Sequence, residues 1–287
     1  MTFPRTFPVV HNITNYVAMG ISANALLAVG ASPLMSSAPA EMEDIASFAA
    51  AMVANLGCLE PLQVEAMSIA AAAYHRLGKP WVLDPAGVGI GAFRREFALR
   101  LIAECRPTAI RGNASEIMVL AGKRTEPGGM DSYIADAGPW RVPGPGGRED
   151  SAEASECVGG DGNAKVAGNV ECAMELARQS GAIVVMSGKT DFITDGKEVW
   201  KVEGGSPRMA EVTAMGCTAS AMVAAMMTEN PDRMDAAKDA MLLMARAGEM
   251  ADARSTGPGS FAVSFIDALD AIRKGAANSG TDANRKD

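Results

Sequence analysis

Three short apolar runs in this chain each end in a single polar residue, and this feature limits the possible folds most strongly. The runs are Trp-Val-Leu-Asp84, Ala-Ile-Arg111 and Ile-Val-Val-Met-Ser187. Short apolar runs are typical of strands that are buried on both faces of a parallel sheet. Because ligands of such a sheet bind at the carboxyl ends of its strands, the three polar endings predict an active site along this edge.

Helical patterns alternate with the strand patterns, which predicts an α/β fold with a mostly parallel central sheet and helices on both faces. An earlier strand over 52–55 leads into a helix that begins at Pro61 and closes at Gly78. The other predicted elements are helices over 94–105, 166–179, 216–227, 235–253 and 261–272, a helix that begins at Asn113, and a hairpin over 191–202 that turns at Asp195-Gly196.

The domain organisation follows from where the regular patterns stop. Nine glycines and four prolines between Thr125 and Asn163 predict an irregular insertion over about 125–163. Residues 274–287 are polar and rich in Gly and Asn, which predicts a flexible tail. We therefore predict one domain over residues 1–273 that carries this insertion, followed by the tail.

Charge and cysteine content exclude other classes of protein. With 26 basic and 34 acidic residues the net charge is −8, so neither nucleic acid nor an anionic membrane is an expected partner, and a phosphorylated ligand needs a local positive site. The stretch 11–40 is uncharged, but it is too polar for a span of about 20 apolar residues. Five cysteines without CxxC spacing argue against a disulfide framework or a zinc ribbon and favour the cytoplasm.

Small residues gather just before the apolar helix over 216–227, in the segment Glu-Val-Thr-Ala-Met-Gly-Cys that ends at Cys217. Free backbone N–H groups at a helix start bind anions, and the helix dipole favours a thiolate there. Cys217 is therefore a candidate proton acceptor. The alternative is a structural cysteine beside a helix start, because free cysteines are commonly buried.

Asn113 and Glu116 stand three residues apart at a helix start, directly after Arg111. This spacing is typical of a capping box. An arginine beside an amide and a carboxylate also fits a phosphate with a hydrated Mg²⁺, since Mg²⁺ takes one or two carboxylates together with phosphate oxygens. Both interpretations stay open from the residues alone.

Two further segments are ambiguous from the residues alone. The loop Asp-Pro-Ala-Gly-Val-Gly-Ile-Gly that starts at Asp84 lacks the G-x-G-x-x-G spacing of dinucleotide-binding loops, and it fits either metal or phosphate contact or a plain turn. The polar segment from His11 to Asn15 precedes an apolar stretch and predicts a helix with Thr14 or Asn15 as its N-cap. Only two histidines occur, too few for a histidine-based zinc site.

Taken together and in this order, the motifs of the chain resemble those of the hydroxyethylthiazole kinase family. The most specific are His-Asn-Ile-Thr-Asn from His11 and Arg-Gly-Asn-Ala-Ser-Glu from Arg111. The others are Ala-Asn ending at Asn24, Gly-Ala-Ser-Pro-Leu-Met from Gly30, Asp-Pro-Ala-Gly-Val-Gly from Asp84, and Gly-Pro-Gly-Ser-Phe from Gly257. The resemblance covers nearly the whole chain except the insertion and the tail.

The resemblance implies a ribokinase-like fold, ATP and Mg²⁺ as cosubstrate and cofactor, and phosphorylation of the hydroxyethyl arm of a thiazole in thiamine salvage. It further implies a homotrimer with substrate sites between protomers. Its implied site residues are Cys217 as the catalytic base, Arg111, Ser187 and Asn113 for ATP, Asp84 and Glu116 for Mg²⁺ and its waters, and Met35, Ala214, Asn15, Asn24 and Gly57 for the thiazole.

The chain departs from the pattern of this family at three places, one of which is the long Gly- and Pro-rich insertion over about 125–163. The family's Gly-Thr-Gly-Cys stands here as Ala214-Met215-Gly216-Cys217, and Asn12 replaces a usual cysteine. A positive φ at Ala214 would cost about 1 kcal/mol, and an inward Met215 would narrow the pocket. These departures leave two alternatives open: a ribokinase-like kinase of another small alcohol, and a binding protein that holds ATP or thiazole without turnover.

Overall fold

A single eight-stranded sheet forms the centre of the protein, as seen in a computed structural model that describes residues 1–123 and 162–283. The strand order is β2-β1-β3-β4-β5-β6-β7-β8; the first six strands are parallel, and β7 and β8 form an antiparallel hairpin at one edge. The strands are β1 (Val9–Ile13), β2 (Ser32–Met35), β3 (Ala51–Asn55), β4 (Trp81–Asp84), β5 (Ala109–Asn113), β6 (Ile183–Ser187), β7 (Asp191–Thr194) and β8 (Val199–Val202).

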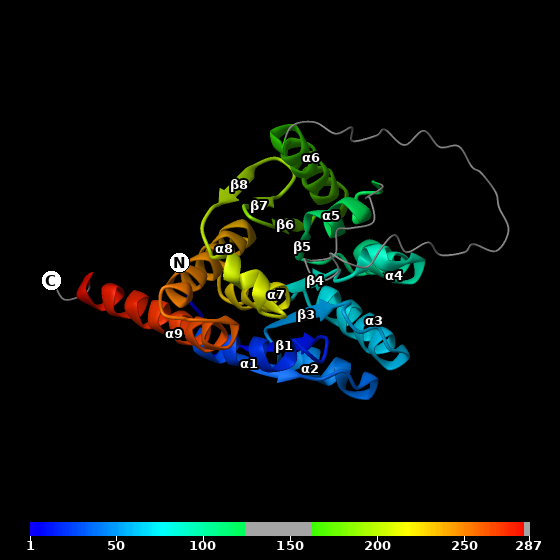
Figure 1. Cartoon of the computed structure of the whole chain (residues 1–287). Helices are drawn as coiled ribbons and strands as arrows, with labels where there is room; N and C mark the ends of the chain where they lie inside the picture. The colour runs from blue at the N-terminus through cyan, green and yellow to red at the C-terminus, as the bar shows by residue number, and fades with distance from the viewer. Residues whose placement is uncertain (124–161, 284–287) are drawn as a thin grey trace.

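Helices cover both faces of the sheet, which confirms the predicted α/β class (Figure 1). One face is covered by α1 (Met19–Ala28), α7 (Met215–Met226) and α8 (Arg233–Asp252), and α9 (Pro258–Ala283) packs outside them against α1 and α8. The other face packs against α2 (Met42–Phe48), α3 (Pro61–Arg76), α4 (Ala92–Cys105), α5 (Ala114–Leu120) and α6 (Gly162–Ser180). Short 3₁₀ helices include η2 (Val88–Ile90) and η4 (Pro207–Glu211).

Successive residues of a strand alternate between two hydrophobic cores, as the pleat requires. In β3, Val53 belongs to the core under α7, whereas Met52 and Ala54 belong to the core under α3 and α4. Val82 of β4 likewise faces α7. The residue two positions after Val53 or Val82 therefore also directs its side chain to the α7 side of the sheet.

The predictions for the first 40 residues are partly wrong. The segment from His11 does not start a helix, because Val9–Ile13 forms the buried strand β1 and the helix α1 starts only at Met19, with Ala18 as its N-cap. Strand β2 and helix α2 were not predicted. Buried His11 and Asn12 are compatible with a strand because their side chains contact backbone carbonyl groups: His11 Nε2 lies 3.1 Å from the Ser36 carbonyl oxygen, and Asn12 Nδ2 donates to the Val10 carbonyl oxygen at 2.9 Å.

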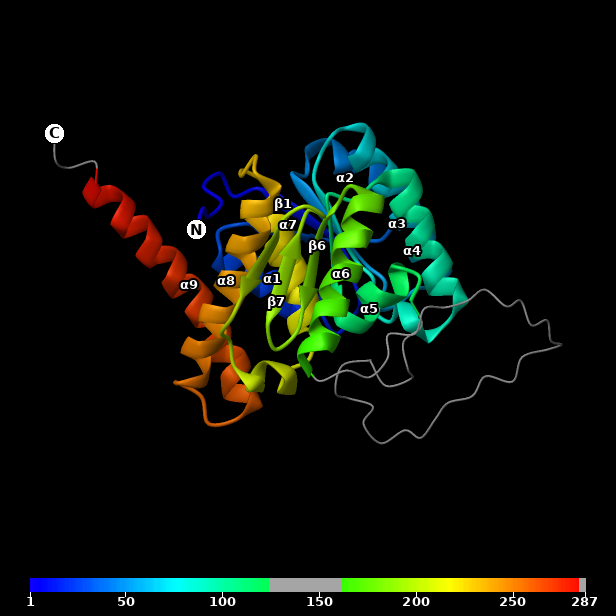
Figure 2. The ribbon, with the colours of Figure 1, turned by 90° about the horizontal axis from the view of Figure 1, so that it is seen from above.

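The C-terminal helix is longer than predicted. Helix α9 continues past Ile272 to Ala283, so most of the stretch predicted as a flexible tail is helical, and its last turns project from the body (Figure 2). The apolar face continues as well, because Ile272 and Ala276 both pack against the core. The predicted insertion over 125–163 lies almost entirely outside the described residues.

Within the described ranges, no helix is long and apolar enough to cross a membrane. The uncharged stretch 11–40 divides into β1, α1, β2 and a short 3₁₀ turn. Polar residues interrupt the stretch 11–40 at the boundaries between these elements.

Candidate active site

The strand register brings the polar strand endings together on the α7 side of the sheet. Asn55 is the register partner of Asp84, and Asn113 is the partner of Ser187. Arg111 stands two residues after Ala109, which faces α7, so its side chain emerges on the same side. Asp84, Arg111 and Ser187 were predicted to share one edge of the sheet, and the register places them on adjacent strands β4, β5 and β6.

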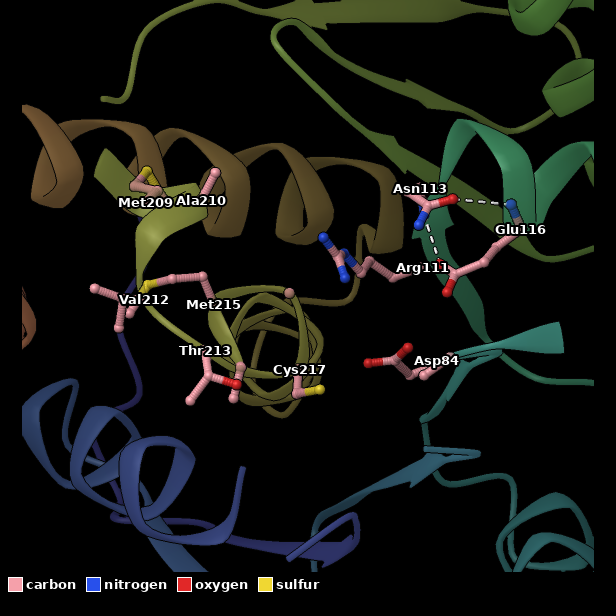
Figure 3. A pocket seen from close by; sticks show the side chains of 13 residues that line it. Asp84, Arg111, Asn113, Glu116, Met209, Ala210, Val212, Thr213, Met215 and Cys217 are labelled. Atoms are coloured by element: carbon pink, nitrogen blue, oxygen red, sulfur yellow. Dashed lines mark hydrogen bonds between the residues drawn. The ribbon is translucent and has the colours of Figure 1, made fainter. Parts of the chain in front are cut away.

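A cavity of about 230 Å³ opens between these strand ends and the start of α7. Figure 3 shows the Arg111 guanidinium, the Asp84 carboxylate and the Cys217 side chain directed toward the same space. A larger cavity of about 990 Å³ adjoins it over the loop between β6 and β7, and Arg111, Asn113 and Met215 line both. The smaller cavity is lined by Asp84, Ala86, Arg111, Asn113, Glu116, Met209, Ala210, Val212, Thr213, Ala214, Met215, Gly216 and Cys217.

Arg111 presents an unsatisfied buried donor to this site. Its Nη2 donates to Ser187 Oγ, but its buried Nε has no hydrogen-bond partner among the described residues. A side chain at Gly216 would place a Cβ 2.5 Å from Arg111 Nη1, so glycine is needed for the guanidinium to reach the helix start. A buried donor without a partner is costly, and an anion bound here would satisfy it.

Glu116 both caps a helix and faces the cavity. Its Oε2 accepts from Asn113 N at 2.8 Å while Asn113 Oδ1 accepts from Glu116 N at 2.9 Å, which confirms the predicted capping box. Its Oε1 accepts from Gly87 N at 3.0 Å, which ties the glycine-rich loop after β4 to α5. Burial, and then the nearby Asp84 carboxylate, raise the pKa of Glu116 to about 7. Such a pair of carboxylates favours a bound cation.

A hydrogen bond from α7 holds the Asp84 carboxylate in place. Its Oδ2 accepts from Ser220 Oγ of α7 at 2.8 Å, and only 1% of the residue is exposed. Within the described part of the chain no group of three or more His, Cys, Asp or Glu residues is placed to hold a metal ion. Two carboxylates beside an unsatisfied arginine nevertheless fit Mg²⁺, which commonly takes one or two carboxylates and completes its shell with phosphate oxygens and water.

The thiol of Cys217 lies at the start of α7 as predicted, but its expected acidity is wrong. Burial, and then the Asp84 carboxylate, raise the pKa of Cys217 to about 12, although bonds from Asn15 and Asn55 and the charge of Arg111 act in the opposite direction. The predicted effect of the helix dipole is therefore outweighed by desolvation. Asn15, predicted as a thiazole contact, donates from Nδ2 to the Cys217 Sγ at 3.2 Å.

Other residues implied for the thiazole lie apart from the Cys217 cavity within one chain. Met35 is half-buried at the end of the edge strand β2, and Asn24 is exposed on α1. Gly57 follows β3 and packs against the side chains of Asn15 and Asn55. Of the predicted thiazole contacts, only Ala214 lines the cavity itself.

Sequence reasoning missed two residues of this site, Asn55 and Ser220. Asn55 ends the run Ala-Met-Val-Ala-Asn and obeys the same rule as Asp84, Arg111 and Ser187, so the strand-end signal was sufficient to find it. Ser220 carries no comparable signal, because a serine inside an apolar helix is recognised as a partner only when the facing Asp84 is known.

Ala214 adopts the left-handed conformation that was considered from the sequence. It is the N-cap of α7 with φ 64° and ψ 13°, a region that costs L-residues roughly 1–2 kcal/mol. The adjacent Met215 is buried and lines both cavities. The helix start thus keeps the conformation that a glycine would favour, at the expense of some stability.

Replacing Ala214 with glycine is expected to raise the free energy of unfolding by about 1 kcal/mol, because the strain at positive φ disappears. Urea unfolding followed by circular dichroism measures this change. Ala72 is exposed in the middle of α3 and serves as the control: Ala72→Gly is expected to lower stability by about 0.5–1 kcal/mol. Equal losses in both variants would contradict the proposed strain.

The parallel part of the sheet carries a carboxylate pair and an arginine at its strand ends. These groups lie beneath the start of α7, where the Arg111 guanidinium closely approaches the backbone of Gly216. This arrangement defines a small-molecule kinase of the ribokinase-like class. The model of the family described as "Hydroxyethylthiazole kinase family" matches residues 2–142 and 151–275. The chain belongs to the hydroxyethylthiazole kinase family.

Individual relatives agree with this assignment. A hydroxyethylthiazole kinase from Nitratidesulfovibrio vulgaris strain DP4 is 42% identical over 265 residues, covering 92% of this chain and 88% of the relative. The structure of a hydroxyethylthiazole kinase protein from Pyrococcus horikoshii OT3 matches with a TM-score of 0.74 at 29% identity, covering 92% of this chain and 88% of that one. A ribokinase-like superfamily protein from Enterococcus faecalis V583 matches in fold, with a TM-score of 0.62 at 13% identity over 93% and 86% of the two chains. The predicted family, ribokinase-like fold and kinase class are confirmed.

Proposed function

We propose that this protein transfers the γ-phosphoryl group of ATP to the hydroxyl of 4-methyl-5-(2-hydroxyethyl)thiazole, the reaction that salvages this thiazole for thiamine synthesis. The observation that carries the proposal is the convergence of Asp84, Arg111, Glu116 and Cys217 on one cavity at the start of α7, in a chain of the hydroxyethylthiazole kinase family. Phosphoryl transfer depends mainly on positioning and charge stabilisation, and this cavity offers both.

Arg111 is the main positive group proposed for the nucleotide. The bond to Ser187 fixes the guanidinium at the boundary of the two cavities, and its Nε is unpaired. The phosphates of ATP would extend at this point from one cavity into the other. Asn113 has its Oδ1 engaged in the capping box, so its amino group remains for a phosphate oxygen. The backbone N–H groups at the start of α7 add positive potential from the other side.

Asp84 and Glu116 are the residues proposed to hold Mg²⁺. Both oxygens of Glu116 already accept a backbone N–H bond, which favours contact through water, whereas Asp84 faces the cavity held by Ser220. The bound ion would supply charge neutralisation for the phosphates. Asp84 and Glu116 would hold it in the smaller cavity, which both residues line.

Cys217 is proposed to receive the proton of the alcohol as a thiolate, after its own thiol proton has passed to solvent, because the raised pKa keeps the unreacted thiol protonated near neutral pH. In a loose phosphoryl-transfer transition state the alcohol loses its proton late, so a modest acceptor at the right place suffices. The sulfur lies on the opposite side of the cavity from Arg111, where a substrate hydroxyl directed at the terminal phosphate would pass.

The activity is tested by incubating the purified full chain with Mg-ATP and hydroxyethylthiazole and following ADP and the phosphorylated thiazole. Pyrimidine and sugar alcohols serve as comparison substrates. Absence of both products under all conditions, with ligand-induced thermal stabilisation retained, would replace the proposed kinase activity with binding alone.

We also propose that the active protein is a homotrimer whose substrate sites lie between protomers. In the strand order, β1 and β3 separate β2 from β4, which places Met35 roughly 14 Å from Asp84 at about 4.8 Å per strand. A second copy is therefore needed to bring a Met35 to the Cys217 cavity. The exposed side of residues 17–27 suits such a contact, because it is uncharged: Val17, just before α1, is 67% exposed, and Leu27 of α1 is 57% exposed.

Subunit complementation tests the shared site. Cys217→Ala and Met35→Arg are each expected to abolish most activity, and mixed oligomers made by refolding the two together are expected to regain activity well above either variant alone. Sedimentation velocity is expected to show three copies of the 29.7 kDa chain. A monomer with full activity, or mixtures no better than the separate variants, would contradict the proposal.

We further propose that the predicted domain over residues 1–273, which α9 extends to Ala283, acts as one domain in the cytoplasm. One continuous sheet unites the described strands, and five cysteines without CxxC spacing support a reducing compartment.

A further inference from the structure

Two asparagine amides converge on the sulfur of Cys217. Asn15 Nδ2 and Asn55 Nδ2 each donate to Cys217 Sγ at 3.2 Å. Asn55 comes from the end of β3 and is fully buried, and Asn15 comes from the segment after β1 and is 6% exposed. Neither is among the described residues that line the cavity, so the amides approach the sulfur from behind while its other side faces the cavity.

The orientation of both amides is fixed by backbone donors. Asn15 Oδ1 accepts from Ala18 N at 3.0 Å, and Asn55 Oδ1 accepts from Gly57 N at 2.9 Å. Asn15 Nδ2 also donates to Asn55 Oδ1 at 3.0 Å. Because each carbonyl oxygen is held by an N–H group, each amino group must point to the sulfur, and a flipped amide would lose these bonds.

Gly57 makes this arrangement possible. A Cβ at residue 57 would lie 2.8 Å from Asn15 Nδ2 and 2.8 Å from Asn55 Oδ1, so any side chain would separate the amides. Asn55 is the register partner of Asp84 and bonds the Cys217 sulfur, so the sulfur lies beside Asp84 at the end of β4. The position of the sulfur is thus defined by three parts of the fold: the sheet, the turn after β3 and the start of α1.

We propose that Asn15 and Asn55 are positioning residues that hold the Cys217 sulfur with its free side toward the substrate hydroxyl. This inference rests on the proposed role of Cys217 as proton acceptor. Two amide donors on one side restrict the sulfur to one rotamer, and their N–H dipoles stabilise the thiolate that must be present before the alcohol proton is transferred. They oppose the effect of Asp84, which faces the sulfur from β4, and act together with Arg111 of β5.

Asn55→Asp tests the proposal with little change of shape. The new side chain keeps an oxygen for Gly57 N but has no amino group for the sulfur. The expected result is a fall of kcat by about 10- to 100-fold, with KM for both substrates changed less than about threefold, since the lost bond serves the reacting state. Asn15→Asp keeps the oxygen for Ala18 N and is expected to act in the same direction.

Asn12→Asp is the matched control. Asn12 is equally buried, lies on the neighbouring strand β1, and donates its amide to the Val10 carbonyl oxygen rather than to sulfur. Its kcat is expected to stay within about threefold of the parent, because no reacting group is touched. Thermal unfolding of all variants measures whether each of them folds.

A second readout does not depend on kinase activity. Alkylation of Cys217 by iodoacetamide at one fixed pH, followed by peptide mass spectrometry, is expected to slow in Asn55→Asp and Asn15→Asp and to stay unchanged in Asn12→Asp. If Asn55→Asp behaves like Asn12→Asp in both kcat and alkylation, the inference is overturned. If the parent protein does not phosphorylate the thiazole while the alkylation rates separate as expected, the proposed function fails and the amide contacts with the sulfur are supported.

Discussion

Replacing Arg111 with methionine is expected to lower kcat by about 10³-fold, which is the largest effect of any single change at this site. Methionine keeps much of the apolar volume but removes the guanidinium that lies at the boundary of the two cavities. In phosphoryl transfer, a fixed arginine stabilises charge on the transferred group in a site that excludes water. KM for ATP is expected to rise as well, whereas KM for the thiazole changes little. Steady-state kinetics with both substrates varied provides the measurement.

The control for this change is Arg233→Met. Arg233 is also partly buried and donates to the backbone carbonyls of Met227 and Asn230, but it lies at the opposite end of α7 from the cavity. Its loss is expected to reduce stability without a change in kcat. Arg111→Lys should restore only part of the activity, because an ammonium cannot contact Ser187 and two phosphate oxygens in one plane. Full activity in Arg111→Met would exclude Arg111 as the nucleotide-binding arginine.

Site residues could be predicted from the sequence where the signal is local to one strand. Asp84, Arg111 and Ser187 could be predicted because an apolar run with a polar last residue reports both the strand and the end at which it opens. The same reasoning extends to Asn55 once β3 is included. The capping box of Asn113 and Glu116 is equally local, since both partners lie within one helical turn.

Prediction failed where the deciding partner is distant in the chain. The strand β1 contains His11, whose polarity argues against a buried strand until the Ser36 carbonyl, 25 residues later, is known to lie beside it. The acidity of Cys217 was judged from its helix alone, but Asp84, 133 residues earlier, and burial raise the pKa of its thiol. Ser220 has meaning only through the same aspartate.

Asp84→Asn is expected to have two effects of opposite sign. Kinase activity should fall by about 10²- to 10³-fold, because the carboxylate proposed to hold Mg²⁺ becomes neutral while its size is unchanged. The reactivity of the Cys217 thiol should rise, because the charge of Asp84 raises the pKa of that thiol. Below its pKa the thiolate fraction grows as the pKa falls, so alkylation at pH 8 to 9, measured without ligands, becomes faster.

The opposite signs distinguish an electrostatic role from damage to the fold. A misfolded site would lose activity and also expose other thiols such as Cys105 and Cys172, which are buried in the parent protein. Peptide mass spectrometry separates the two cases, because the electrostatic role predicts faster alkylation at Cys217 alone. Asp232→Asn, at the N-cap of α8 on the far side of α7, controls for the loss of one negative charge and should change neither rate. Slower alkylation of Cys217 in Asp84→Asn would contradict the assignment, because the carboxylate would then be supporting the thiolate instead of opposing it.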